Sequence, residues 1–189
     1  MEAKGVTNLS NMIGHNFRLG EVECAIGVEQ LKKLSSLVES RQALASALTE
    51  GLQGMPGLKT PVTKEDRTHT FYVYAMQVDT AVLGVSRDRL CKALQAEGLW
   101  VNGRYQNIHL LPVYQKKIAY GSGGFPWSSN LCRRQVNYSK GICPVAERMQ
   151  DDSYIGLGMC IHELGLSQIP LLVAAFRKVW SALPDLGRQ

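Results

Sequence analysis

The feature of this sequence that most constrains its fold is a long stretch, residues 20–50, in which apolar side chains recur mostly at intervals of three or four. They are Val22, Ala25, Ile26, Leu31, Leu34, Leu37, Val38, Leu44, Ala45 and Leu48. This spacing places them along one side of a helix and therefore predicts a single long amphipathic helix. Gly51 and Gly54 end the helix, and the sequence Met-Pro-Gly at 55–57 predicts a turn after it.

After this helix, the pattern alternates between strand and helix. Residues 69–79 are rich in β-branched and aromatic side chains, which is typical of a strand. Ser86 is a suitable N-cap for a helix that runs through Leu94 and stops at Gly98. Residues 99–102 should then form a second strand.

Residues 103–140 are expected to be loop-rich, because they contain Pro112, Pro126 and the run Gly121-Ser122-Gly123-Gly124. A short helix around 145–150 and a third strand over 154–162 should follow. Ser167 is expected to cap a final helix in which Pro170 is tolerated because it falls in the first turn. This order predicts an α+β fold, in which a long N-terminal helix precedes a small, mainly antiparallel sheet with helices packed on one face.

Composition limits what the chain does. Its 189 residues suffice for one domain or two small ones, and 45% hydrophobic with 20% charged residues is ordinary for a soluble globular protein. The net charge of +5 is mild, and no basic stripe with interleaved aromatic residues is visible, so nucleic-acid binding is not expected. No apolar run is long enough to cross a bilayer, and the N-terminus lacks the apolar segment of a secretory signal. We therefore expect a cytoplasmic protein with no membrane contact.

Other candidate motifs are weak. The five cysteines contain no CxxC pair, and the four histidines do not complete a zinc pattern, so reduced thiols and no metal site are expected. GSGGF at 121–125 is not followed by the Lys-Ser/Thr of a phosphate loop and is interpreted as a flexible surface turn. His109 and His162 are isolated, and Cys143 has no nearby histidine in sequence, so none of them indicates a catalytic group.

Asn16 and Arg18 form a more specific pattern, because they stand just ahead of the predicted long helix. A helix that begins near Gly20 exposes unpaired backbone N–H groups and a positive dipole end, which together attract anions. Arg18 adds a forked donor suited to phosphate, and Asn16 adds an amide. The alternative is that Arg18 pairs with a glutamate of the first turn, at 21 or 23, and the residues alone favour this alternative.

The stretch NMIGHNFRLGEVECAIGVEQL at 11–31 resembles a signature of the DegT/DnrJ/StrS-type nucleotide-sugar aminotransferases, which are pyridoxal-phosphate (PLP) enzymes of the aspartate-aminotransferase fold. Their pattern runs approximately G-Y-N-[YF]-R-[ML]-x-E-x-x-A-A-[IL]-G-x-x-Q-L. His15 stands where tyrosine is usual, and Cys24 where alanine is usual. HTFYVYAMQVD, SRDRLCKALQAEGLWVNGRY, HLLPVYQKKIAYG and CPVAERM are similar to later parts of the family in the same order. The resemblance therefore covers essentially the whole chain.

The resemblance implies the C-terminal part of such an enzyme: a segment with the phosphate-contact motif (1–19), a long connecting helix (20–54) and the small domain of a fold-type I PLP enzyme (55–189). In the family, the Asn and Arg of the motif reach the cofactor phosphate of a neighbouring subunit, which assigns that role to Asn16 and Arg18. Four further residues would face a nucleotide-linked sugar: Tyr72, Arg104, Tyr105 and His109. A homodimer, or pairing with an aminotransferase large domain, is implied as well.

The family's Schiff-base lysine lies in a large domain upstream, and no lysine here has the family's active-site context. Lys4, the only lysine ahead of the motif, lacks the expected Gly-Glu-Gly-Gly-like surroundings. Since transamination needs that lysine, we expect no catalytic residue, no bound PLP and no turnover from this chain alone. The alternative is a stand-alone, non-catalytic binding or assembly module derived from the same domain.

Overall fold

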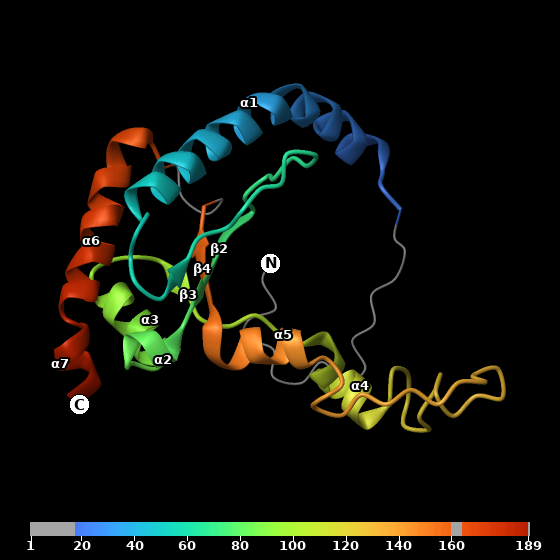
Figure 1. Cartoon of the computed structure of the whole chain (residues 1–189). Coiled ribbons are helices and arrows are strands. Elements are labelled where there is room, and N and C mark those ends of the chain that lie inside the picture. The colour runs from blue at the N-terminus through green and yellow to red at the C-terminus, as the bar shows by residue number, and fades with distance from the viewer. Residues whose placement is uncertain (1–17, 160–163, 189) are drawn as a thin grey trace. The chain divides into compact units, whose positions relative to one another are not determined.

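The computed structural model describes residues 18–159 and 164–188, which form two compact units (Figure 1). The larger unit comprises residues 20–105 and 149–189, and the smaller comprises 1–19 and 106–148. Asn16 and His162 lie outside the described residues.

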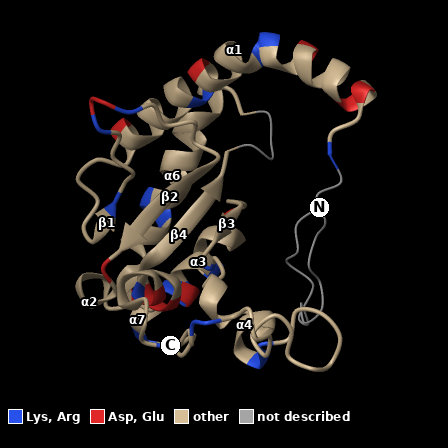
Figure 2. Ribbon diagram, turned by 90° about the vertical axis from the view of Figure 1, so that its right-hand side faces the viewer, with Lys and Arg blue, Asp and Glu red and all other residues tan. Residues whose placement is uncertain are grey.

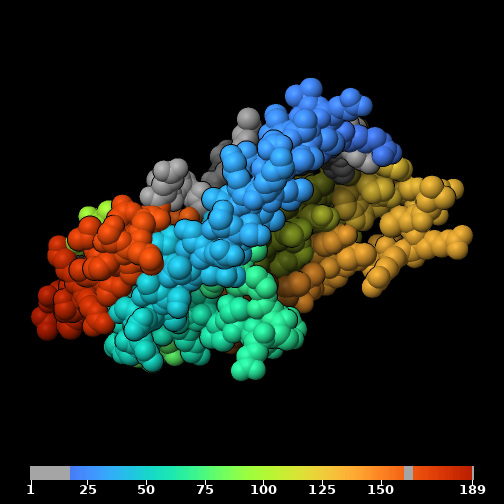
Figure 3. Space-filling view, turned by 90° about the horizontal axis from the view of Figure 1, so that it is seen from above, coloured from blue at the N-terminus to red at the C-terminus, as the bar shows by residue number. Residues whose placement is uncertain are grey.

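Helix α1, Glu21–Gly51, opens the larger unit and confirms the long helix predicted from the apolar spacing. Its last turns are buried through Leu44, Ala45 and Leu48, and they lie beside helix α6, Ile169–Ser181 (Figure 3). Its first turns differ, because every residue from 21 to 40 except Gly27 and Val38 is exposed. The apolar side predicted for the helix is therefore covered only at the C-terminal end by the rest of its unit.

Four strands form an antiparallel sheet in the order β1-β2-β4-β3 (Figure 2). They are β1 Leu58–Lys59, β2 Val73–Val78, β3 Val101–Asn102 and β4 Tyr154–Gly158. The central pair β2–β4 holds the register Tyr74↔Leu157 and Met76↔Ile155, and these four side chains are buried. The alternate residues Ala75 and Gln77 are exposed, so β2 has one buried and one open face.

Helices cover the buried face. They are α1, α2 Thr80–Leu83, α3 Arg87–Ala96, α6 and α7 Leu183–Arg188, with a 3₁₀ turn η4 at Leu166–Gln168 ahead of α6. Ser86 caps α3 and accepts a hydrogen bond from the Arg89 backbone. The Trp180 indole donates to the Pro56 carbonyl oxygen (2.9 Å), which joins α6 to the turn after α1. The opposite face of the sheet carries no helix from the described part of this unit, and the predicted α+β architecture is confirmed.

The smaller unit contains the turn η2 (Ile108–Leu110) and helix α4 (Pro112–Lys116), which lie within the segment 103–140 expected to be loop-rich. It also contains helix α5 (Pro144–Arg148), which corresponds to the short helix predicted around 145–150. Tyr114, Trp127 and Tyr138 pack ring against ring, with centroids 5.1–6.3 Å apart, and the Trp127 indole donates to the Tyr138 hydroxyl. This aromatic cluster gives the segment a small apolar centre of its own.

Several boundaries differ from the predictions. The strand predicted for 69–79 begins only at Val73, because Phe71 has a left-handed backbone (φ 48°), and it ends where Asp79 caps α2. The strand predicted for 154–162 is Tyr154–Gly158, and residues 160–162 lie outside the described part of the chain. Ser167 does not cap the last helix: it lies within the preceding 3₁₀ turn, and Gln168 is the cap position of α6. No described helix has the length and apolarity needed to cross a lipid bilayer.

Candidate functional site

The open face of the sheet carries a tyrosine laid across it. The Tyr154 hydroxyl lies over Gly156, so close that a side chain at 156 would collide with it. Ala75 pairs with Gly156 on the neighbouring strand and is also small. Two small residues thus provide the space for the ring, and Tyr154 becomes part of the surface of the sheet.

Two predicted site residues gather around this ring. The Tyr105 ring meets the Tyr154 ring edge-on, with centroids 6.4 Å apart, and Tyr72 is close enough for their phenols to interact electrostatically. Partial burial raises the pKa of Tyr154, and the neighbouring phenols of Tyr105 and Tyr72 raise it further. Tyr72 and Tyr105 are 60% and 62% exposed, so their aromatic surfaces are available to a ligand.

The buried side chain of Arg87 fixes the main chain around this site. Its side chain is only 2% exposed and donates to four backbone carbonyl oxygens, those of Gly103, Gln150 (3.0 Å), Asp151 (2.9 Å) and Tyr154 (3.3 Å). These carbonyls belong to the segment after β3, to the π-helical turn η3, Met149–Ser153, and to the first residue of β4. One guanidinium therefore ties together the two segments that present Tyr105 and Tyr154.

Asp88 links this buried arginine to a predicted site residue. It accepts from Arg87 Nε (2.6 Å) and from Arg104 Nη2 (2.7 Å). The hydrogen bond from Arg104, reinforced by Arg87, lowers the pKa of Asp88 although partial burial opposes this effect. Arg104 is anchored at its backbone too, because its N–H donates to Asn102 Oδ1 (3.0 Å). The Tyr105 N–H donates to Gln150 Oε1 (2.6 Å), so both loop residues have fixed main-chain positions.

His109, the fourth predicted sugar contact, lies in the smaller unit. Its side chain is 11% exposed, and its Nε2 lies 2.8 Å from Glu147 Oε1. Glu147 also accepts from the backbone N–H groups of Gly141 and Cys143. Burial opposes ionisation of Glu147, but these N–H donors and His109 outweigh it and lower its pKa. The contact between His109 and Glu147 thus joins the beginning and the end of the segment 106–148.

The same unit is cationic. Within 106–148 the single acidic residue is Glu147, whose carboxylate is already bonded as above. The basic residues of the segment are Lys116, Lys117, Arg133, Arg134, Lys140 and Arg148. Arg18, assigned to the same unit, is exposed and has a left-handed backbone (φ 57°). No ion pair of Arg18 is formed within the described part of the chain.

The structure thus brings Tyr72, Arg104 and Tyr105 into one unit and places His109 and Arg18 in the other. Sequence reasoning missed Tyr154 and Arg87. A signal for Arg87 does exist, because Arg87, Leu90, Cys91 and Leu94 follow the 3/4 spacing of the buried side of α3, as the structure confirms. A charged residue on an apolar side requires buried partners. No comparable signal marks Tyr154, whose position depends on Gly156.

The long helix, followed by a small antiparallel sheet with helices on one face, is a fold that solved aminotransferases share. The fold therefore places the chain in the class of the small domains of PLP-dependent aminotransferases. The aminotransferase TlmJ from Streptoalloteichus hindustanus has a TM-score of 0.62 at 22% identity, over 92% of this chain and 40% of TlmJ. Helicobacter pylori PseC, an aminotransferase of pseudoaminic acid biosynthesis, has a TM-score of 0.62 at 20% identity, over 90% of this chain and 40% of its own.

The chain belongs to the DegT/DnrJ/EryC1/StrS aminotransferase family, whose sequence profile matches residues 1–154. It is 29% identical over 140 residues to the spore coat polysaccharide biosynthesis protein SpsC of Bacillus subtilis, which covers 74% of this chain and 35% of SpsC. It is 25% identical over 151 residues to the uncharacterized protein MJ1066 of Methanocaldococcus jannaschii, with 80% and 38% covered. The chain therefore spans 35–38% of the length of these relatives.

Proposed function

We propose that these residues form the small-domain part of a PLP-dependent enzyme that transfers an amino group, from glutamate, to a keto group of a nucleotide-linked sugar. In this division, residues 1–19 carry the phosphate-contact motif, 20–54 the connecting helix and 55–189 the small domain. The observation that carries the proposal is the convergence of Tyr72 and Tyr105, distant in sequence and both expected at the substrate, around Tyr154.

The tyrosines suit the substrate class. Aromatic rings with hydroxyl tips present both a stacking surface and hydrogen-bond partners, which a sugar ring or a base needs. Arg104 adds a forked donor for phosphate beside them, and Asp88 holds it in place. Considered by itself, the cationic segment 106–148 favours anionic ligands.

The cofactor phosphate has a fitting partner in Arg18, whose exposed guanidinium suits a phosphate oxygen pair. Asn16 and Arg18 would hold the phosphate of PLP bound in a neighbouring subunit. When bound, PLP supplies the electron sink for amino transfer, and the lysine that anchors it would come from a large domain. On this proposal, the 189 residues alone bind no PLP and do not turn over.

The open side of α1 supports a partner for the chain. Val22, Ile26, Leu31, Leu34 and Leu37 are each at least 46% exposed. Exposed apolar surface of this kind favours association. In the complete enzyme it would pack on the large domain or on a second subunit. The same surface also favours the alternative function, a non-catalytic assembly module that pairs with a full-length aminotransferase.

Two measurements test the proposal. A PLP titration of the purified chain, followed by borohydride trapping and mass spectrometry, should show only scattered lysine modification. Stoichiometric trapping at one lysine would overturn the proposed catalytic incompleteness. Titration with UDP-, dTDP-, GDP- and CDP-sugars, followed by tyrosine and tryptophan fluorescence, should give binding that Tyr105→Ala weakens about tenfold. The control is Tyr120→Ala in the smaller unit, and equal loss in both variants would argue against the tyrosine site.

A further inference from the structure

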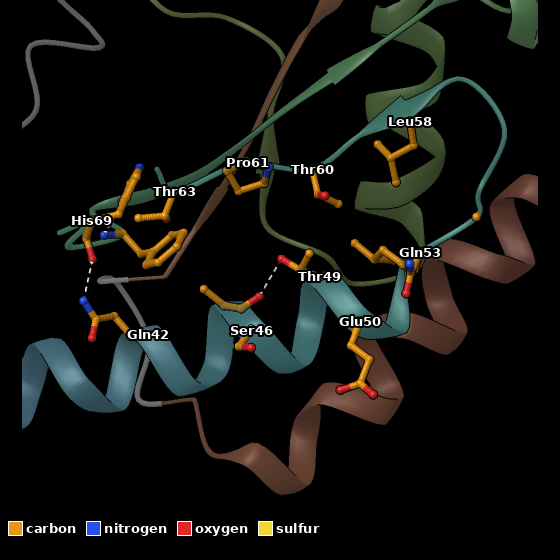
Figure 4. Close-up of a pocket in the computed structure, with 14 residues that line it drawn as sticks. Gln42, Ser46, Thr49, Glu50, Gln53, Leu58, Thr60, Pro61, Thr63 and His69 are labelled. Atoms are coloured by element: carbon orange, nitrogen blue, oxygen red, sulfur yellow. Dashed lines mark hydrogen bonds between the residues drawn. The ribbon is translucent and has the colours of Figure 1, made fainter. Parts of the chain in front are cut away.

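A second surface feature lies beside the C-terminal part of α1 (Figure 4). It is a cleft of about 780 Å³ between the C-terminal part of α1 and the segment 58–71, and we refer to it as the α1–β1 cleft. Its walls belong to the larger unit. A cleft of this volume is in the range of small-molecule sites. None of the predicted site residues lines it.

The walls of the α1–β1 cleft are mainly polar. Gln42, Ser46 and Thr49 succeed one another at intervals of four and three on α1, which places them on one side of the helix, and Gln53 follows in the turn after it. The facing segment contributes the hydroxyls of Thr60 and Thr63. Glu50 is the one acidic residue of the lining, and its carboxylate points away from the facing segment (Figure 4).

Part of this polar lining serves the fold, and part of it is unused. The Gln42 amide donates to the His69 carbonyl oxygen (3.1 Å), and Thr49 bonds to the Tyr74 hydroxyl (2.7 Å). The Ser46, Gln53 and Thr63 side chains, in contrast, have no hydrogen-bond partner among residues 18–159 and 164–188. Two hydroxyls and an amide thus offer both donors and acceptors.

The segment that faces α1 ends in a pair of stacked rings. The rings of His69 and Phe71 lie with centroids 4.1 Å apart, and His69 Nδ1 accepts from the Phe71 N–H (2.8 Å). Because Nδ1 is the acceptor, the neutral ring carries its proton on Nε2, which is then a donor. Phe71 keeps a left-handed backbone (φ 48°), a strained state for a non-glycine residue that is maintained where surrounding contacts fix it.

We propose that the α1–β1 cleft binds a neutral oligosaccharide. The lining contains no lysine or arginine for an anionic ligand, and its one carboxylate, that of Glu50, points away from the facing segment (Figure 4). A sugar hydroxyl donates and accepts at the same time, which matches the hydroxyls and amides of the lining. Apolar lining atoms from Leu58 and Pro61 match the C–H faces of a sugar ring, and the half-buried His69 ring, stacked on Phe71, adds an aromatic end. This site is independent of the proposed aminotransferase function and of the tyrosine site.

The test is a printed array of neutral and acidic oligosaccharides probed with the full 189-residue chain, labelled with a fluorophore at its accessible thiols, among them the exposed Cys24 and Cys143, which do not line the cleft. Saturation-transfer NMR with the unlabelled chain then measures the affinity of the best neutral ligand. Ser46→Trp fills the cleft and should lower retention at least tenfold. The matched control is Ser40→Trp, which adds the same ring to an exposed position of α1 outside the cleft.

A milder pair of variants guards against misfolding. Thr63→Val removes one unused hydroxyl and should weaken binding about threefold to tenfold, whereas Thr68→Val, an exposed position of the same segment outside the cleft, should not. Retention of a neutral oligosaccharide with this pattern of losses supports the proposal. Retention of acidic oligosaccharides alone, no retention at all, or binding unaffected by both Ser46→Trp and Thr63→Val overturns it.

Discussion

Replacing Gly103 with alanine should destabilise the chain far more than a single methyl group suggests. A Cβ at position 103 would lie 2.7 Å from Arg87 Cδ and 2.9 Å from Cys91 Sγ. The backbone of Gly103 is not left-handed, so alanine meets no strain from φ, and the whole effect is steric. Both neighbours are buried on α3 and have little room to move.

The magnitude follows from what Arg87 would lose. Overpacking by a methyl group costs about 1–3 kcal/mol. A shift of Arg87 also weakens its hydrogen bonds to the carbonyls of Gly103, Gln150, Asp151 and Tyr154, and a hydrogen bond from a charged group contributes about 1.5–3 kcal/mol. Since only part of this network need be lost, we expect Gly103→Ala to lower the free energy of unfolding by about 2–4 kcal/mol.

Urea denaturation followed by circular dichroism measures this change. The matched control is Gly27→Ala in the exposed part of α1, where an added Cβ meets no atom within 4 Å. The same substitution there should stabilise the chain by about 0.5–1 kcal/mol, because alanine favours a helix. If Gly103→Ala lowers the free energy of unfolding by less than about 1 kcal/mol, then Arg87 is not held as tightly as its contacts indicate.

Three further outcomes are expected. Arg87→Lys should lower the free energy of unfolding, measured by urea denaturation, by about 3 kcal/mol or more, because one ammonium group cannot reach four carbonyls. A smaller loss would contradict the role of Arg87 as a clamp, that is, as the side chain that holds these four carbonyls together. The lowered pKa of Glu147 means that its contribution to stability is present above its unfolded pKa of about 4.3 and is lost as pH falls through its lower folded pKa. The melting temperature should therefore fall more steeply below about pH 4 in the parent chain than in Glu147→Gln, and parallel curves would argue against the bonds of Glu147 to Cys143, Gly141 and His109. Burial raises the pKa of Cys91 to about 11, so iodoacetamide at pH 8 should modify the exposed Cys24 and leave Cys91 unmodified until the chain unfolds, as peptide mass mapping would show.

The elements that could be predicted from the sequence are those whose signal is local and repeated. The helix at 21–51 and the helix at 87–96 have enough turns for the apolar spacing to repeat, and a suitable cap or stop at an end. Strand β1 was missed because two residues, Leu58 and Lys59, cannot display a period. It exists only because it pairs with the end of β2.

The residues of the candidate site also divide into those that the sequence could predict and those that it could not. Tyr72, Arg104 and Tyr105 were predicted because motif positions carry them, and the structure shows that they share one unit. Tyr154 could not be found, because a tyrosine at the start of a strand gives no hint that its ring turns along the sheet. That geometry needs a glycine two residues later and a small residue beside this glycine on the neighbouring strand. The second condition is met by Ala75, and only the strand register shows that Ala75 lies beside Gly156.

The clamp formed by Arg87 has a consequence for how this domain can diversify. Its four acceptors at Gly103, Gln150, Asp151 and Tyr154 are all main-chain oxygens, which every amino acid possesses. Side chains at three of these positions can therefore change without loss of the clamp, and only Gly103 is restricted by close approach. Neighbouring exposed residues such as Tyr105 are free to change as well. A fixed main-chain scaffold under interchangeable side chains lets evolution alter ligand preference without rebuilding the fold.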